Sequence, residues 1–231
     1  LQMSAEKRMS RRFSLHGSYV WGKALEGARL TNDTTAGGAQ NMNNLRAERA
    51  RTEYDKRHVV VLSGRWEVDY FEGANPVLRH ILNHWRLTAG YNWESGDPFT
   101  VTSGVDSNLD GSNDRAHSLG RSGRLDPNRS RNEVVQLWFD PTAFSIPRTG
   151  EDGNAGRFVL DTPGNTGLNL SIFRNFQVRE SLTLQFRCEM TNAFNIVNLS
   201  GPASDLSNIR VAQITGAGAM RRAQLGLRLV F

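Results

Sequence analysis

No run of about 18 or more apolar residues, the length that a membrane-spanning helix needs, occurs anywhere in this chain. That absence excludes a transmembrane helix. It does not exclude a membrane barrel, because a barrel strand needs only about 10 residues that alternate between apolar and polar. The chain has 231 residues, of which 38% are hydrophobic and 22% are charged. This composition is typical of one folded domain and not of a disordered segment.

Cysteine and the motifs of common enzymes are also scarce. Cys188 is the single cysteine, so the chain has neither an internal disulfide nor a cysteine metal cluster. The motifs H-E-x-x-H and G-x-S-x-G of metalloproteases and hydrolases do not occur. The glycine-rich residues 216–218 precede a predicted strand instead of a helix, which argues against a phosphate-binding loop. We therefore expect a protein that is not an enzyme.

Long runs of one charge sign are missing as well. The net charge is +5 and the isoelectric point is about 9.9, a balance that can indicate nucleic-acid binding. The basic residues are scattered in small groups, however, and no nucleic-acid-binding motif accompanies them. We expect them to be solvated side chains of the surface and of a barrel lumen, and we expect no nucleic-acid partner.

What the chain has instead is a repeated alternation of apolar and polar residues, the period of a β-strand. In the C-terminal segment 220–231, one strand face would carry Leu225, Leu227, Leu229 and Phe231. Six further segments show the same alternation, at 1–6, 13–21, 60–70, 85–94, 168–176 and 182–194. None of them has the apolar spacing of a helix. The sequence therefore predicts an all-β fold with about seven antiparallel strands.

Three properties favour a transmembrane barrel over a soluble sheet. Several segments approach or exceed ten residues, and aromatic side chains gather near the segment ends, as in interfacial girdles. The connections also alternate in length. The shorter ones are 9–12, 72–84 and 179–181, and the longer ones are 26–56, 95–165 and 199–219. Because outer-membrane barrels have short periplasmic turns and long external loops, this order predicts an up-and-down barrel segment with long extracellular loops.

The number of predicted strands is odd, whereas bacterial single-chain barrels have even numbers. The chain also begins with Leu1 instead of methionine and shows no signal peptide. We therefore expect residues 1–231 to be the C-terminal portion of one outer-membrane β-barrel domain whose first strands are absent.

The polar strand faces carry charged residues in mid-strand, and we expect these to face the lumen. They are Arg65, Glu67, Arg86, Arg187 and Glu189. Arg187 and Glu189 lie two residues apart on one face, which suits an ion-pair network. Arg174 is different because it falls in phase with the apolar face of its strand. A β-bulge or a position near the lipid headgroups would account for it.

The segment 95–165 contains a match to D-x-[DN]-x-[DN]-G, the start of a calcium-binding loop. The candidate metal ligands are the side chains of Asp106, Asn108 and Asp110, the backbone carbonyl of Ser112, and Asp114. His117 stands where such a loop has its bidentate glutamate, and no flanking helices are apparent. The alternative is an Asp/Asn/Gly turn with exposed polar side chains. Calcium is the one cofactor that the sequence suggests.

Several of these segments resemble TonB-dependent receptors of the Oar-like type. The resemblance lies in RH at 57–58, WRLTAG at 85–90, SGDPFT at 95–100, DSNLDG at 106–111, WFDPTAF at 138–144, PG at 163–164, FRCEMTNAFN at 186–195 and QLGLRLVF at 224–231. It implies an outer-membrane barrel of about 22 strands in a Gram-negative bacterium, of which this chain is the last third. It also implies an N-terminal carboxypeptidase-regulatory-like domain, a plug and a TonB box. None of these is visible in this sequence.

The resemblance implies solute uptake or surface binding, in which the loops 26–56 and 95–165 contact the ligand. TonB would be reached only through the N-terminal parts. The closing strand resembles the signal read by the barrel assembly machinery, which we expect to recognise Leu225, Leu227, Leu229 and Phe231. Membrane lipid is the other expected partner. One alternative is a non-transporting adhesion or structural protein with calcium-binding loops, and another is a soluble secreted β-sandwich that binds carbohydrate.

Overall fold

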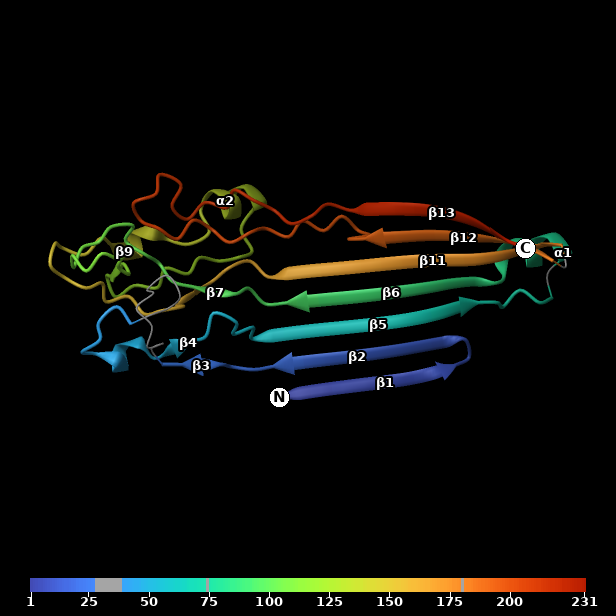
Figure 1. The fold of residues 1–231 in the computed structure, drawn as a ribbon, viewed down its shortest axis with the longest axis horizontal. Coiled ribbons are helices and arrows are strands. Elements are labelled where there is room, and N and C mark those ends of the chain that lie inside the picture. The colour runs from blue at the N-terminus through green and yellow to red at the C-terminus, as the bar shows by residue number, and fades with distance from the viewer. Residues whose placement is uncertain (28–38, 74, 180) are drawn as a thin grey trace.

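The centre of the molecule is one antiparallel sheet of seven strands, seen in a computed structural model that describes residues 1–27, 39–73, 75–179 and 181–231 (Figure 1). The strands are β1 (Gln2–Ser10), β2 (Phe13–Trp21), β5 (His58–Val68), β6 (Trp85–Glu94), β11 (Asn165–Arg179), β12 (Leu182–Thr191) and β13 (Arg222–Val230). They pair in chain order, each with its successor. The predicted seven-stranded meander is confirmed.

The strand register brings the apolar positions of all seven strands to one side of the sheet, here called the apolar face. One row across it consists of Phe13, Trp66, Leu87, Ile172, Cys188 and Leu225. The next row along belongs to the opposite, polar face and consists of Ser14, Arg65, Thr88, Ser171, Glu189 and Gln224. A slip of one residue in any strand would exchange its two faces, so the alternation fixes the register.

The apolar face is largely uncovered. Leu227, for example, is 72% exposed, although a soluble sheet would pack such a side chain under a second layer. Within the described residues the strands β1 and β13 each have a single partner, so the sheet is an open segment and not a closed barrel. The sheet therefore has the surface of a barrel wall and the edges of an incomplete one.

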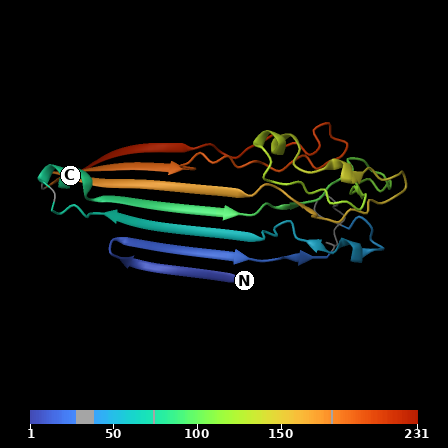
Figure 2. The same ribbon diagram turned by 180° about the vertical axis from the view of Figure 1, so that it is seen from behind.

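The two ends of the sheet differ. At the turn end, residues 11–12 join β1 to β2, residues 69–84 join β5 to β6, and the junction of β11 and β12 includes residue 180, which lies outside the described residues (Figures 1 and 2). The chain's C-terminus lies at the same end. The connections at the opposite end are long, which confirms the predicted alternation. The turn end also contains a short helix that the sequence pattern did not predict, α1 (Pro76–Leu82).

The long connections fold together at the loop end. Their described residues within 22–57, 95–164 and 192–221 are here called the loop cap. It contains β3 (Leu25–Glu26), β4 (Ala50–Arg51), β7 (Pro98–Phe99), β8 (His117–Ser118), β9 (Phe144–Ser145), β10 (Leu160–Asp161), α2 (Arg131–Gln136) and the 3-10 turns η2 (Leu45–Glu48) and η3 (Pro141–Ala143). Part of the predicted loop 26–56, residues 28–38, lies outside the described residues.

The buried apolar core of the molecule lies in the loop cap. Its members are Val101, Ala116, Phe139, Ala143, Phe144, Ala155, Leu160 and Ala212. The ring of Phe139 lies 5.7 Å from that of Phe99 and 6.2 Å from that of Phe144, centroid to centroid. The connections 95–164 and 192–221 are thus packed together by a small water-excluding core. Of the helices in the described part of the chain, none has both the length and the apolar character that crossing a membrane requires.

Candidate functional site

The polar face of the sheet carries the charged residues that we expect in a lumen. Arg65 and Glu67 of β5 form an ion pair, and Nε of Arg86 on β6 lies 3.6 Å from Oε1 of Glu67. The three side chains come together because residues 67 and 86 are direct partners in the ladder. All three are partly exposed. The group forms a hydrated charged patch on the polar face near the turn end.

Arg187 and Glu189 lie on the same polar face but do not form the ion pair that their spacing suggested. Nε of Arg187 donates to Oε1 of Gln185 at 3.0 Å, on the opposite side from Glu189. Its guanidinium also lies over the ring of Phe173, 5.4 Å from the centroid, and Phe173 is its direct partner across the strands. This cross-strand stacking and the hydrogen bond with Gln185 explain why the side chain turns away from Glu189.

Arg174 lies on the apolar face without a bulge. The register of β11 with β12 is continuous from residue 170 to 177 and shifts only between Gln177 and Arg179. The bulge explanation for Arg174 is therefore wrong. Its side chain is buried at the turn end of the sheet, between the rings of Trp85 and Phe176.

Buried ion pairs connect the loops of the cap. Glu48 is only 1% exposed and accepts hydrogen bonds from Nη1 and Nη2 of Arg115 at 3.0 and 2.8 Å. Nη2 of Arg157, which is also buried, donates to Oε1 of Glu26 at 2.6 Å. A bidentate pair fixes both distance and orientation, and removing one partner would leave a buried charge unpaired. These contacts tie residues 22–57 to residues 95–164.

A second connection lies at the base of the cap, around Asp55. Its buried carboxylate accepts hydrogen bonds from Nε of Arg51 at 2.6 Å and from the backbone N–H of Ala24 at 2.7 Å. Arg51 also bonds to Asp161, which belongs to another loop. Burial alone would raise the pKa of Asp55, but the Ala24 N–H and the Arg51 guanidinium outweigh it and hold that pKa below its usual value. Asp55 is therefore a charged anchor of the cap.

In the predicted calcium loop, the side-chain oxygens of the candidate ligands accept hydrogen bonds from backbone N–H groups of the same loop. Asp106 accepts hydrogen bonds from the N–H groups of Asp110 and Gly111 at 3.0 and 2.9 Å. Asp110 accepts one from the N–H of Ser112 at 2.9 Å, and its own N–H also lies 3.1 Å from Oδ1 of Asn108. These are the contacts of an Asx-type turn, the alternative that the sequence left open.

Asp114 is the buried member of this loop. It accepts hydrogen bonds from the N–H groups of Ser107 and Asn108 at 2.6 and 3.0 Å. Burial raises its pKa, and so do the nearby charges of Asp110 and Asp152, although the two hydrogen bonds act against them. Among the described residues, no three His, Cys, Asp or Glu side chains form a group that could hold a metal ion. Calcium binding stays a prediction.

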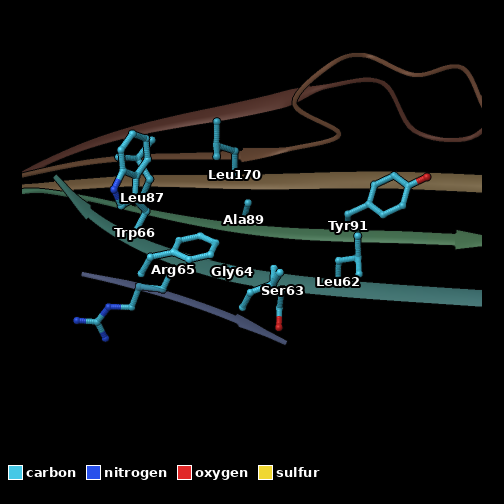
Figure 3. Close-up of a pocket in the computed structure, with 11 residues that line it drawn as sticks. Leu62, Ser63, Gly64, Arg65, Trp66, Leu87, Ala89, Tyr91 and Leu170 are labelled. Atoms are coloured by element: carbon cyan, nitrogen blue, oxygen red, sulfur yellow. The ribbon is translucent and has the colours of Figure 1, made fainter. Parts of the chain in front are cut away.

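The apolar face contains a hollow with a volume of about 290 Å³ (Figure 3). Gly64 and Ala89 are partners in neighbouring strands, and the space is left because Gly64 has no side chain and Ala89 has only a methyl group. Larger side chains surround them, namely Phe13, Leu15, Leu62, Trp66, Leu87, Tyr91 and Leu170. Figure 3 shows the side chain of Arg65 pointing away from the hollow, toward the other side of the sheet. The hollow fits a hydrocarbon chain and not a polar solute. The alternation within a single strand could not predict this hollow, because the hollow depends on the register that places Gly64 of one strand beside Ala89 of the next.

Strand β13 places three of the four predicted assembly residues on the apolar face. Leu225, Leu227 and Leu229 pair with residues of β12 and are exposed, and Phe231 follows the last ladder position. An uncovered apolar face, a charged polar face and connections of strictly alternating length define this chain as a wall segment of a membrane β-barrel.

The comparisons with known proteins agree with this class. The family model described as "Outer membrane beta barrel domain" matches residues 1–224, so the chain belongs to that family and its location is the outer membrane of a Gram-negative bacterium. No curated protein and no solved structure matches the chain.

Proposed function

We propose that this chain supplies wall, external loops and closing strand to a TonB-dependent receptor-like transporter for solute uptake. The observation that carries the proposal is the loop cap. Two of its connections, 95–164 and 192–221, share one core, and the third, 22–57, is fixed to them by buried pairs such as Glu48 with Arg115. A preorganised external surface binds a ligand at a lower entropic cost than free loops do. Neither an enzymatic step nor a nucleic-acid partner is part of this proposal.

In this mechanism the loop cap captures a solute, the charged polar face of the sheet lines its path, and a plug inside the barrel gates it. Periplasmic TonB would pull on the plug. The plug, the TonB box and a barrel of about 22 strands are implied only by the family resemblance. Residues 1–231 themselves contribute the strands of the barrel wall and the external loops.

The test is genetic and uses the full-length protein. Strains that lack its gene, the TonB gene, or both are grown with single nutrients limiting. Uptake predicts that deletion of the gene impairs growth on at least one nutrient, and that the double deletion is no worse than loss of TonB alone. Normal growth on every nutrient would contradict the proposal, as would a defect that adds to that of the TonB deletion.

A second candidate is a non-transporting adhesion or structural protein whose loops bind calcium. The observation in its favour is that Asp106 and Asp110 are exposed and form no ion pair with a basic side chain among the described residues. Calorimetric titration of the intact barrel with calcium tests it, with the variant Asp106→Asn as the comparison. Saturable binding that the substitution weakens supports the site, and no heat in the wild type eliminates it.

We also propose that the barrel assembly machinery recognises β13 through Leu225, Leu227, Leu229 and Phe231. The support is the position of the three leucines on the uncovered apolar face of an edge strand, with the exposed Phe231 directly after it. An exposed strand edge can pair with another strand, and recruitment by an assembly factor would use that property.

A further inference from the structure

Helix α1 exposes an apolar surface at the turn end of the sheet. Its first turn is set by Asn75, whose side chain accepts a hydrogen bond from the N–H of Leu78 at 2.8 Å, and by Pro76 at the first helical position. The exposed apolar side chains of the helix are Val77, Leu78, Ile81 and Leu82. The side chain of Ile81, for example, is 52% exposed. A seven-residue helix is marginal by itself, so its surroundings must stabilise it.

The contacts of α1 place it on the apolar side of the sheet. Nε1 of Trp85 donates to the carbonyl of Ile81 at 2.9 Å, and Arg174 donates to the same carbonyl. The ring of His80 lies 6.2 Å from that of Phe176. Trp85, Arg174 and Phe176 all occupy apolar-face positions of the ladder. The helix is thus outside the barrel wall, on the side where the membrane lies, and not over the lumen.

Arg174 is the buried group that holds α1 to the sheet. It is 2% exposed, and its guanidinium lies 5.0 Å from the ring centroid of Trp85 and 4.2 Å from that of Phe176. Nη1 binds the Ile81 carbonyl, whose position near the helix C-terminus gives it partial negative charge. Nε and Nη2 have no hydrogen-bond partner among the described residues. Stacking on two rings and binding the helix end compensate a charge that a lipid-facing position would otherwise disfavour.

We propose that α1 is an interfacial helix that lies in the periplasmic headgroup layer of the outer membrane, with its apolar side chains in the lipid leaflet, and that Arg174 fixes it to the barrel wall. Two observations identify phospholipid as the occupant of its surface. The helix packs against the apolar face of the sheet, so its exposed apolar side chains lie on the same side of the wall as the lipid-facing residues of the strands. The helix also carries Arg79 and His80 and no acidic residue, which suits anionic headgroups.

The experiment uses the full-length barrel in vesicles of phosphatidylethanolamine and phosphatidylglycerol. Every native cysteine, Cys188 included, is replaced by serine, and Ile81→Cys carries a bimane fluorophore. The matched control is Ile209→Cys, an isoleucine of the loop cap that is 95% exposed. Lipids with a nitroxide near the headgroup should quench the label at 81 more than aqueous iodide does, and the order should reverse at 209. A label at 81 that behaves like the one at 209 would overturn the inference and would leave the surface to a soluble partner.

The same label tests the part played by Arg174. Arg174→Gln should move the label at 81 toward iodide, while heat-modifiable migration on gels shows that the barrel is folded. Arg65→Gln on the polar face is the matched control and should leave the quenching unchanged. Unchanged lipid quenching in folded Arg174→Gln would show that Arg174 does not hold the helix. If the glutamine variant does not fold, Arg174→Lys gives the readout, because lysine keeps the charge but loses the planar stacking.

Discussion

The sheet and the loop cap bury their residues in opposite ways. In the cap, Val101, Phe139 and Ala212 are shielded from water, and charges such as Glu48 are buried in pairs. In the seven-stranded sheet the described residues include one buried side chain, Arg174, and most of the large apolar side chains lie on the uncovered apolar face. The burial pattern of the cap suits water, and that of the sheet suits lipid on its apolar face. The cap excludes water as a small soluble protein does, while the sheet leaves its apolar face to lipid.

This difference separates what stabilises each region. In the cap, packing and buried ion pairs hold loops that have little regular hydrogen bonding. In the sheet, the backbone ladder provides the order, and the lipid replaces a protein core. A substitution should therefore affect one region and spare the other, and the predictions that follow are ordered by the size of the expected effect.

The largest effect is expected from Phe139→Ala in the cap. Phe139 is buried between Phe99 and Phe144, and the removal of a buried phenylalanine ring costs about 3–5 kcal/mol. The loops should become sensitive to protease while the barrel still migrates as a folded species on gels. Phe194→Ala, at an exposed phenylalanine just beyond β12, is the matched control and should stay resistant. Loss of the folded band in Phe139→Ala would show that cap and sheet are not independent.

The next effect is expected from Leu227→Arg in the sheet. A charge that faces lipid in mid-membrane costs about 2–4 kcal/mol, so less folded barrel should accumulate in the membrane. Gln224→Arg, three residues away and on the polar face, is the control and should fold normally. Folded fractions from heat-modifiable gels measure both variants. Equal amounts of folded Leu227→Arg and wild type would contradict the assignment of the two faces.

A pH effect should separate the regions without any substitution. The pKa of Asp55 is lower in the folded protein than in the unfolded chain, so its stabilising contribution is complete above the unfolded pKa of about 3.9. It is lost as the pH falls further, through the folded pKa. The cap should loosen in this acidic range before the sheet does, as hydrogen exchange of loop and strand amides would measure. In Asp55→Asn the contribution of this group disappears, and a pH profile identical to that of the wild type would refute the role of Asp55.

The sheet could be predicted from sequence because its environment is uniform. Every strand meets lipid on one side and water on the other, so alternation within a single segment, as in 220–231, carries the whole pattern. The predicted boundaries differ from the structure mainly at strand ends, such as β1, which continues to Ser10. The cap has no such regularity. Its core joins Val101 in one long connection to Ala212 in another, and no local period predicts contacts between residues so far apart in the sequence.

The candidate site divides in the same way. Sequence placed Arg65, Glu67 and Arg86 on one face, and the ladder brings them together. It could not show that stacking on Phe173 would turn Arg187 away from Glu189, because that contact joins residues of two different strands. Helix α1 did have a local signal, an asparagine followed by proline, but seven residues are too few for a helical period to stand out.

The smallest effect is expected from Arg86→Gln on the polar face. Its guanidinium lies 3.6 Å from Glu67, but both side chains are partly exposed, and such pairs contribute about 0.2–1 kcal/mol. Folding should therefore remain close to that of the wild type, with a slightly lower urea midpoint. The double substitution Arg86→Gln with Glu67→Gln measures the coupling between the two. A loss of stability as large as that of Leu227→Arg would mean that the polar face is buried in the complete barrel and is not the wall of a hydrated lumen.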